Sequence, residues 1–410
     1  MFEFLTSLLI ISLPINLAKT FIVDFGYVQG SLVDYLLPKI YFVQIIQAIF
    51  VIYVLYKFSI YLIVVQSKNK ALKWFILIYL IFTLLSGLVA KNIGSFIYSY
   101  ITLLLNVCFA FCIGFVFYKY QKFYELFGLL ISYVVIFISV VGIYQFIFQE
   151  SLFNNYLLFG EIPFTFSTYM ISKENFFGFT KIPAYSIFSH PNVFGAFLSI
   201  SLIWVFYFKK KIAFVFGIIG LLLTFSFLSY FVTFFGIISL IFIKKFGKTS
   251  VIASLIFILI FTFSSFFVPI YSKVLNYTTL IVRGNLQNAS LEIISNAFFT
   301  GVGLNNSLMY MNSYLRIPNI VRFIQPVHNI YLLILSEIGI FGLLGFLGIC
   351  FSLFITLLRQ SYGVPAVLFV SLSQLLLLGS YDHYIVTIIQ TQLLFWLTVG
   401  FIITYTYKND

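Results

Sequence analysis

The stretch FIQPVHNIYLLILSEIGIFGLLGF, residues 323–346, passes from a polar run into an apolar helix at His328 and Asn329. An imidazole at the water end of a membrane helix can accept a proton beside a substrate that a lipid carries. This junction is therefore the first candidate for an active site.

Composition indicates an integral membrane protein. Of the 410 residues, 62% are hydrophobic, 21% are aromatic and only 8% are charged, which no soluble globule of this length shows. The net charge of +12 comes from lysines that interrupt apolar runs, so it indicates membrane topology, and no nucleic-acid partner is expected. The three cysteines, Cys108, Cys112 and Cys350, lie inside apolar segments, so neither a disulfide framework nor a metal cluster is expected.

The apolar runs predict about twelve transmembrane helices, since a helix needs roughly 20 residues to cross the hydrocarbon core. The N-terminal run has no basic start and no small-residue cleavage site, so it is expected to stay as the first span. The segment 212–243 is interpreted either as two short spans or as one re-entrant hairpin. The whole chain, 1–410, is expected to form a single all-α membrane domain with spans near 4–22, 40–65, 73–90, 94–117, 123–148, 191–208, 212–228, 230–243, 250–272, 328–356, 363–380 and 385–406.

The lysines and arginines predict the orientation. Basic residues accumulate in cytoplasmic loops, and with cytoplasmic termini every second short loop is basic here. The opposite loops hold most of the acids. The inside loops would carry Lys68, Lys70, Lys73, Lys119, Lys122, Lys209, Lys210, Lys211, Lys244, Lys245, Lys248, Arg359 and Lys408.

Two outward loops, 149–190 and 273–327, are long enough to have functions of their own. The first is rich in aromatic and aliphatic residues, so short amphipathic helices at the membrane interface are expected there. In the second, Leu286, Ala289, Ile293 and Ala297 recur at helical spacing, which predicts a surface helix across the mouth of the bundle.

Arg283 is expected just before that surface helix, and GVGLNN at 301–306 just after it. A guanidinium offers a planar fork to phosphate oxygens, and glycines such as Gly301 and Gly303 let backbone N–H groups approach an anion. Together they could hold a diphosphate. The alternative is that Arg283 reaches lipid headgroups and that the glycines only form a turn.

All three histidines of the chain fall at helix ends on the predicted outer side: His190, His328 and His383. His328 either takes part in catalysis or caps a helix end. His190 either positions Asn192 or contacts the carrier, or it caps a helix before proline. Asp382 and His383 either orient each other or complete the acceptor site, or they form a structural pair. Glu337, about 13 Å deeper along the same helix as His328, is expected to be a buried hydrogen-bonding residue that orders helix packing.

The segment from VRGNLQNASLEIISNAFFTGVGLNN to VHNIYLLILSEIGIFGLLGF, which gives a core motif at 283–346, resembles the core of bacterial O-antigen ligases and O-antigen polymerases. The shared pattern is an arginine, a helix, a Gly-x-Gly turn, and His-Asn before a helix with Glu-x-Gly and Gly-Leu. SHPNVFGAF at 189–197 resembles the family's second signature, a Pro-Asn at the outer start of an earlier helix.

The resemblance implies a GT-C-like glycosyltransferase that takes a glycan from an undecaprenyl diphosphate carrier and passes it to a glycan or lipid acceptor. It would act at the outer face of the bacterial plasma membrane, in O-antigen, capsule or exopolysaccharide assembly, without metal or other cofactor. Arg283 would bind the diphosphate and His328 would be the general base or a diphosphate ligand. Chain-length regulator and flippase proteins are expected partners.

The chain departs from the family at one position. The family has an arginine a few residues before Pro-Asn, whereas GFTKIPAYSIFSHPN offers Lys181, which neutralises phosphate as a point charge but cannot form a bidentate fork. Lys181 is the favoured second cation, and Arg316 and Arg322 in the second outward loop are the alternatives. Asn329, beside His328, is expected to contribute to the same site.

A transporter of polysaccharide or lipid carrier is the other function considered. It would be expected to show charged residues within several spans and internal repeats. The sequence shows few such charges and no clear repeat, which favours the enzyme.

Overall fold

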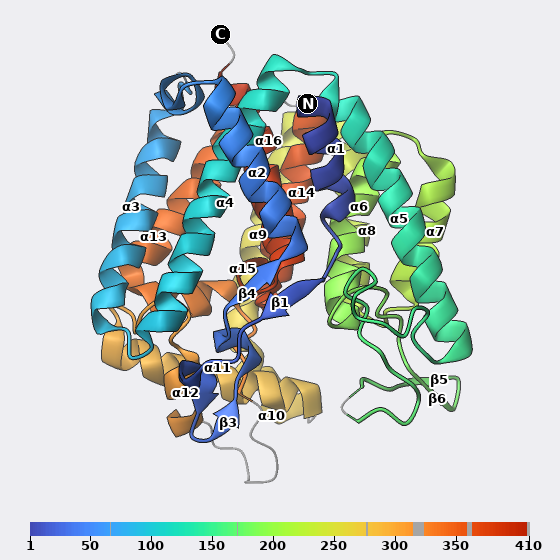
Figure 1. Ribbon diagram of the computed structural model, residues 1–410, viewed down its shortest axis with the longest axis vertical. Coiled ribbons are helices and arrows are strands. Elements are labelled where there is room, and N and C mark those ends of the chain that lie inside the picture. The colour runs from blue at the N-terminus through green and yellow to red at the C-terminus, as the bar shows by residue number, and fades with distance from the viewer. Residues whose placement is uncertain (66, 170, 276–277, 315–323, 359–362, 408–410) are drawn as a thin grey trace.

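The computed structural model describes residues 1–410 apart from 66, 170, 276–277, 315–323, 359–362 and 408–410, and it is a bundle of apolar helices with three small hairpin pairings (Figure 1). The long helices are α1 (Phe2–Ser12), α2 (Phe42–Lys57), α3 (Lys70–Ser86), α4 (Ile93–Lys119), α5 (Phe123–Phe148), α6 (Pro191–Tyr207), α7 (Lys211–Leu222), α8 (Phe227–Phe246), α9 (Lys248–Ser264), α13 (Ile330–Leu358), α14 (Val364–Tyr381) and α16 (Ile389–Ile403). Between them lie α10 (Val268–Leu275), α11 (Thr278–Ala297), α12 (Leu308–Tyr314) and α15 (Tyr384–Thr387). The strands are β1 (Ala18–Thr20), β2 (Tyr27–Val28), β3 (Ser31–Leu32), β4 (Lys39–Tyr41), β5 (Glu174–Phe176) and β6 (Phe179–Lys181).

The helices have the length and composition of membrane spans. Within the described ranges, eight are long and apolar enough to cross a bilayer, and four shorter apolar helices, α1, α2, α6 and α7, occupy other predicted spans. The segment 212–243 forms two helices, α7 and α8, which resolves the alternative left open by the sequence. The class of multi-spanning, all-helical membrane protein is therefore confirmed.

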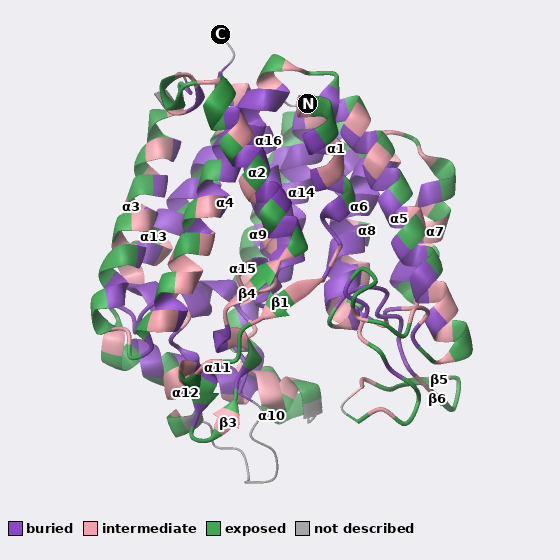
Figure 2. Cartoon of the chain, in the orientation of Figure 1, coloured by how far each residue is buried: buried purple, intermediate pink, exposed green. Residues whose placement is uncertain are grey.

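Burial separates central from peripheral helices. In the most apolar 18-residue stretch of each span, 89% is buried in Val364–Tyr381 (α14) and in Ile389–Thr406 (α16 and the turn after it). In Lys248–Leu275 only 22% is buried. Large apolar side chains stay exposed on the outer faces of peripheral helices such as α3 and α7 (Figure 2), where a bilayer would cover them. Both termini lie at one end of the bundle, and α10, α11 and α12 cover the other (Figure 1).

The first span is shorter than predicted. The expected helix 4–22 ends at Ser12, because Pro14 lacks the N–H that would continue it. The chain then becomes extended, and Ala18–Thr20 pairs antiparallel with Lys39–Tyr41. The second predicted span, 40–65, likewise ends as a regular helix at Lys57.

The predicted surface helix of the second outward loop is confirmed as α11. Leu286, Ala289 and Ile293 are buried and form the apolar stripe expected there. The helix begins at Thr278, so Arg283 lies within it and not just before it. Gly284 lies in this helix where α10 packs against it. A Cβ at Gly284 would lie 2.6 Å from Ser272 Oγ, so the glycine allows the two helices to pack closely.

The first outward loop does not contain the expected amphipathic helices. Apart from residue 170, which is not described, 149–190 consists of turns and the β5–β6 hairpin. A buried carboxylate orders its base, since Glu161 accepts hydrogen bonds from Gln145 Nε2 and from the N–H groups of Leu152, Phe153 and Asn154. Three N–H groups that point to one acid cannot also make helical hydrogen bonds.

Helix α13 is interrupted where it meets the Gly-x-Gly turn. Gly339 has φ 78°, and a Cβ there would lie 2.2 Å from Phe299 O. The N–H groups of Val302 and Gly303 donate to Ser336 O and Glu337 O at 3.0 and 2.9 Å. Glu337 itself accepts hydrogen bonds from the next residues of the turn, Asn305 N and Ser307 Oγ, at 2.9 and 2.8 Å. Its predicted role as a buried residue that orders packing is confirmed.

We expect Gly339→Ala to lower the melting temperature in detergent sharply, because both the positive φ and the contact with Phe299 O oppose a side chain. Gly178→Ala is the matched control. Gly178 has φ 88° but no atom within 4 Å of its Cβ position, so it meets only the backbone strain of about 1–2 kcal/mol. Equal melting temperatures for the two variants would contradict this account of the break in α13.

Candidate active site

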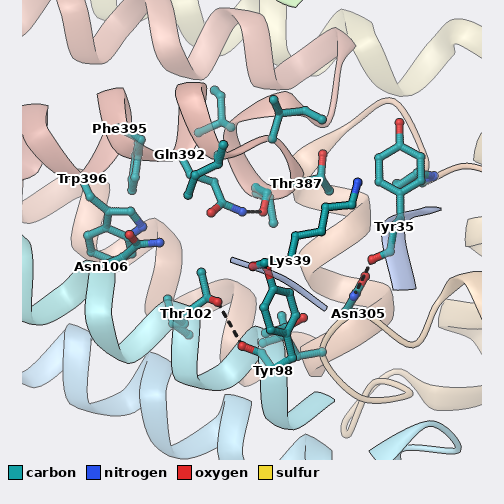
Figure 3. A pocket seen from close by; sticks show the side chains of 18 of the residues that line it. Tyr35, Lys39, Tyr98, Thr102, Asn106, Asn305, Thr387, Gln392, Phe395 and Trp396 are labelled. Atoms are coloured by element: carbon teal, nitrogen blue, oxygen red, sulfur yellow. Dashed lines mark hydrogen bonds between the residues drawn. The ribbon is translucent and has the colours of Figure 1, made fainter. Parts of the chain in front are cut away.

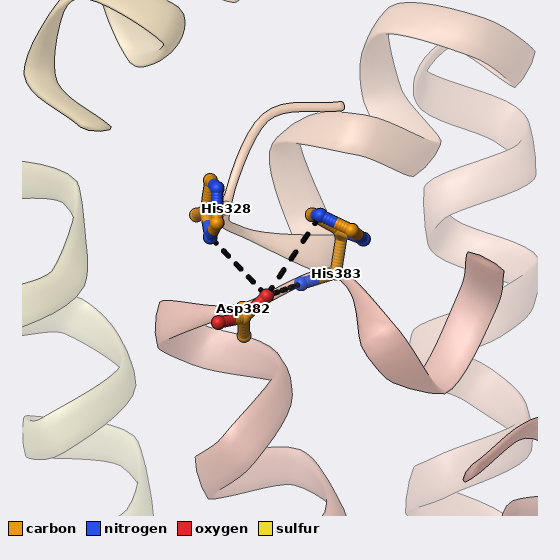
Figure 4. A group of neighbouring side chains, drawn as sticks. All are labelled: His328, Asp382 and His383. Atoms are coloured by element: carbon orange, nitrogen blue, oxygen red, sulfur yellow. Dashed lines mark hydrogen bonds and ion pairs between the residues drawn. The ribbon is translucent and has the colours of Figure 1, made fainter. Parts of the chain in front are cut away.

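Asp382 is the centre of the candidate site. It follows the last residue of α14, and its side chain is only 2% exposed. One carboxylate oxygen, Oδ1, accepts the N–H of His383 at 2.8 Å and lies 3.2 Å from His328 Nδ1, while Oδ2 lies 3.4 Å from Arg283 Nη2 (Figure 4). The structure thus brings together four residues that the sequence singled out separately.

The charges around Asp382 keep it ionised. Burial alone would raise the pKa of this carboxyl, but His328, His383 and Arg283 outweigh burial and hold the pKa well below its usual range. A buried anion requires such compensation. The carboxylate is therefore a fixed negative charge at neutral pH.

His328 is held by the start of α13. Asn329 caps that helix, with Oδ1 accepting the N–H groups of Tyr331 and Leu332 and Nδ2 donating to Ser265 Oγ and Ser380 O. These contacts fix the backbone beside His328, so the Asn329 side chain positions His328. His328 Nδ1 lies 3.2 Å from the carboxylate but without the geometry of a hydrogen bond. With a proton on Nδ1, Nε2 would be the nitrogen that can accept one. The side chain is 13% exposed, so the ring is accessible from one side.

Arg283 reaches the site from α11. Its side chain is 26% exposed, and its contact with Asp382 engages one of the guanidinium nitrogens. A guanidinium carries five N–H donors in a rigid fork. Arg283 can therefore hold the carboxylate on one side and present positive charge to an anion on the other.

His383 is a buried, neutral member of the cluster. Its Nδ1 lies 2.6 Å from Thr387 Oγ1, and its ring meets the rings of Tyr35 and His328 edge-on. Burial lowers its pKa to about 3, in spite of the nearby Asp382. At neutral pH the cations available to Asp382 are therefore Arg283 and, once protonated, His328.

Tyr384 was not identified from the sequence. Its phenol lies close to both Asp382 and Asn192, and burial and the carboxylate raise its pKa, so it stays protonated. Asn192 lies at the start of α6, so this tyrosine joins α6 to the carboxylate. The one signal in the sequence was its position directly after Asp382 and His383.

His190 caps helix α6, the structural alternative given above. Its Nδ1 accepts the N–H of Asn192 at 3.1 Å, and its Nε2 lies 3.4 Å from Ser172 Oγ. Burial lowers its pKa to about 4. It is thus uncharged at neutral pH and positions the Pro-Asn start of the helix.

Other predicted residues lie elsewhere. The N–H groups of Gly301 and Gly303 donate to Ala297 O and Glu337 O, so they form the turn against α13. Lys181 ends strand β6, in a hairpin that Figure 1 shows apart from α15. Arg316 and Arg322 lie outside the described residues.

The same cluster could also hold a cation. His328, Asp382 and His383 offer one ligand atom each, all within 4.8 Å of one another, a set of donors that transition metals accept. The Arg283 guanidinium already neutralises this carboxylate, and a divalent ion would place a second positive charge beside it. The arrangement as it stands is that of a histidine–carboxylate pair beside an arginine.

Fold and cluster together define a multi-spanning membrane protein with a histidine, a carboxylate and an arginine converging at the end of the bundle opposite the termini. The family model described as O-antigen ligase matches residues 193–347, from α6 through α11 to the first part of α13. This match supports the predicted resemblance to the O-antigen ligase and polymerase family. No curated protein sequence matches it. The matched segment includes Arg283 and His328 and ends before Asp382.

The two lowered histidine pKa values predict acid sensitivity. Folded His190 and His383 bind a proton less readily than an unfolded histidine of pKa 6.5. Their contribution to the free energy of unfolding is therefore fully present above that pH and is lost as the pH drops toward about 4. His190→Asn keeps a capping oxygen but cannot titrate, so its melting temperature should fall less between pH 7 and 5 than that of the wild type. Identical pH profiles would show that His190 is not neutral in the folded protein.

Proposed function

We propose that this protein is a glycosyltransferase that moves a glycan from a polyprenyl diphosphate carrier, such as undecaprenyl diphosphate, to an acceptor hydroxyl. The family points to glycan processing at a membrane. The observation that carries the proposal is the Asp382 carboxylate shared between His328 and Arg283 at 3.2 and 3.4 Å, since general-base catalysis and leaving-group stabilisation need these two groups side by side.

The proposed step is a displacement at the anomeric carbon. The acceptor O–H gives its proton to His328 Nε2 while its oxygen forms the new bond to that carbon. The bond from carbon to the diphosphate oxygen breaks, and the diphosphate leaves with the electron pair. Asp382 stabilises the imidazolium formed, as a buried carboxylate does in other acid–base pairs.

Arg283 is proposed to meet the charge that develops on the leaving diphosphate. A fixed cation in a partly buried site stabilises such charge strongly, which is the role a metal plays elsewhere. Lys181 is retained as a proposed second cation in the first outward loop, with Arg316 and Arg322 as alternatives. The reaction is proposed to proceed without a metal and should therefore continue in the presence of chelator.

The site is proposed to face outward from the plasma membrane, with both termini in the cytoplasm. Lys210 lies between α6 and α7, and Gly178 lies in the β5–β6 hairpin at the opposite end of the bundle (Figure 1). Chain-length regulator and flippase proteins remain proposed partners of this arrangement.

We expect His328→Ala and Arg283→Ala each to reduce glycan transfer by about 10²–10⁴-fold, with normal insertion and a lower melting temperature, because each removes a compensating group from the buried Asp382 carboxylate. Arg283→Lys should recover only part of the activity, because an ammonium cannot form the planar fork. The assay is reconstitution with purified carrier-linked oligosaccharide. Its product distinguishes a polymerase, whose glycan stays on carrier, from a ligase, whose glycan moves to another acceptor.

Glu292→Gln is the matched control, because Glu292 is on the exposed face of the same helix α11. It should retain full transfer. Full activity in either alanine variant would remove the proposed site, and carrier movement across the bilayer without any product would favour the transporter instead.

Cysteine labelling tests the orientation in a variant that lacks the three native cysteines. We expect Lys210→Cys to react with a membrane-impermeant reagent only from the cytoplasmic side, and Gly178→Cys only from the outside. The opposite pattern would place the candidate site in the cytoplasm.

A further inference from the structure

A cavity of about 160 Å³ lies beside the candidate site, between the β4–α2 junction, α4, α13 and α16 (Figure 3). It extends from Tyr35 near the outer end to Asn106 and Trp396 within the bundle. Pockets for drug-sized ligands are larger, about 300–1,000 Å³. The cavity therefore has room for one small ring and not for an oligosaccharide.

The cavity adjoins the catalytic cluster through two of its walls. Tyr35 and Thr387 line it, and both touch His383, with the tyrosine ring at 5.5 Å and Thr387 Oγ1 at 2.6 Å from Nδ1. Pro326, two residues before His328, is also part of the lining. A ligand in the cavity is thus held a short distance from the proposed base.

The lining combines aromatic rings with amide and hydroxyl groups. Rings offer flat apolar faces, and amides and hydroxyls both donate and accept hydrogen bonds. A pyranose has the complementary surface, with apolar C–H faces and hydroxyls around its edge. The aromatic members include Tyr35, Tyr98, Phe395 and Trp396, and the polar members include Gln44, Ser99, Thr102, Asn106, Asn305 and Gln392.

Charge argues against an anionic occupant. The lysine of the lining, Lys39, is paired with Asp34 at 2.6 Å. The remaining charged member, Glu337, accepts hydrogen bonds from Asn305 N and Ser307 Oγ. No described residue of the lining supplies an uncompensated cation, so the cavity does not suit a phosphate.

Polarity argues against a hydrocarbon chain. Thr102 and Asn106 lie on the span α4, and Asn106 is 3% exposed and accepts a hydrogen bond from Gln47 at 2.9 Å. A polyprenyl tail in the cavity would leave the remaining hydrogen-bonding capacity of such groups facing hydrocarbon, and a polar position left unsatisfied costs about 1–3 kcal/mol. A hydroxylated ring would instead exchange hydrogen bonds with them.

We propose that this cavity is a saccharide subsite that takes one uncharged pyranose ring of the glycan and positions it against the His328 cluster. The proposal rests on the proposed glycosyl transfer and adds where a sugar is held. The ring belongs either to the acceptor or to the carrier-linked donor, since the chemistry of recognition is the same for both.

Binding can be measured without any transfer reaction. Trp396 lines the cavity, while the other tryptophans, Trp74 and Trp204, do not. In a Trp74→Phe, Trp204→Phe protein the emission therefore reports on the cavity alone. We expect at least one free pyranose, from a panel of hexoses, N-acetylhexosamines and 6-deoxyhexoses, to change this emission saturably.

Two variants test the assignment. Ser99→Phe fills the cavity and should abolish the saturable response, and Thr102→Val should raise Kd for the pyranose about five- to tenfold, as expected for one lost hydrogen bond. Thr398→Val is the matched control, because this threonine of α16 also donates to the carbonyl four residues earlier but lies outside the cavity lining. Its Kd should stay within about twofold.

Transfer kinetics identify the source of the ring. In the reconstituted reaction Thr102→Val should raise KM for the acceptor alone, or for the carrier-linked donor alone, with little change in kcat. Saturable pyranose binding without transfer would leave the subsite standing and overturn the glycosyltransferase. Transfer with no pyranose response at Trp396, or a response only to polyprenyl phosphate, would overturn the subsite.

Discussion

A single buried carboxylate joins the elements at the end of the bundle opposite the termini. Asp382 directly follows α14 and is compensated by groups from two other parts of the chain, the α11 guanidinium and the imidazole before α13. An isolated charge at this depth would be strongly unfavourable. The need to compensate it therefore links α11 and the entry to α13 to the end of α14, which places the guanidinium of Arg283 and the imidazole of His328 together.

The second constraint is backbone contact between the Gly-x-Gly turn and α13. Turn and helix exchange main-chain hydrogen bonds on both sides of Gly339, and Glu337 binds the residues that follow. The Gly-x-Gly turn, which the sequence suggested for anion binding, instead packs closely against α13. The loop that carries Arg283 is thus attached to the helix that carries His328, and the distance between the two groups depends on this contact.

The sequence predicted the helical segments and the identity of the residues around Asp382 because both follow from local information, namely hydropathy and polar residues at helix ends. It did not predict that Asp382 would join Arg283 and His328. Asp382 lies 99 positions after Arg283 along the chain, and no local pattern states that distance. The same limit hid Tyr384, the cavity and the fate of Gly301 and Gly303, whose N–H groups donate to α11 and α13. Pro14 indicated an early end for α1, but the apolar residues around it favoured the prediction of a longer span.

The first outward loop is fastened at its base by Glu161 and Gln145, whose hydrogen bonds join it to α5 and to the approach of α6. The β5–β6 hairpin projects beyond this anchor and is largely exposed. Substitutions and insertions at the hairpin tip consequently leave the hydrogen bonds at the base intact. The tip can therefore vary in sequence and length at little cost to insertion or folding, whereas loss of either anchoring side chain would release the loop from α5.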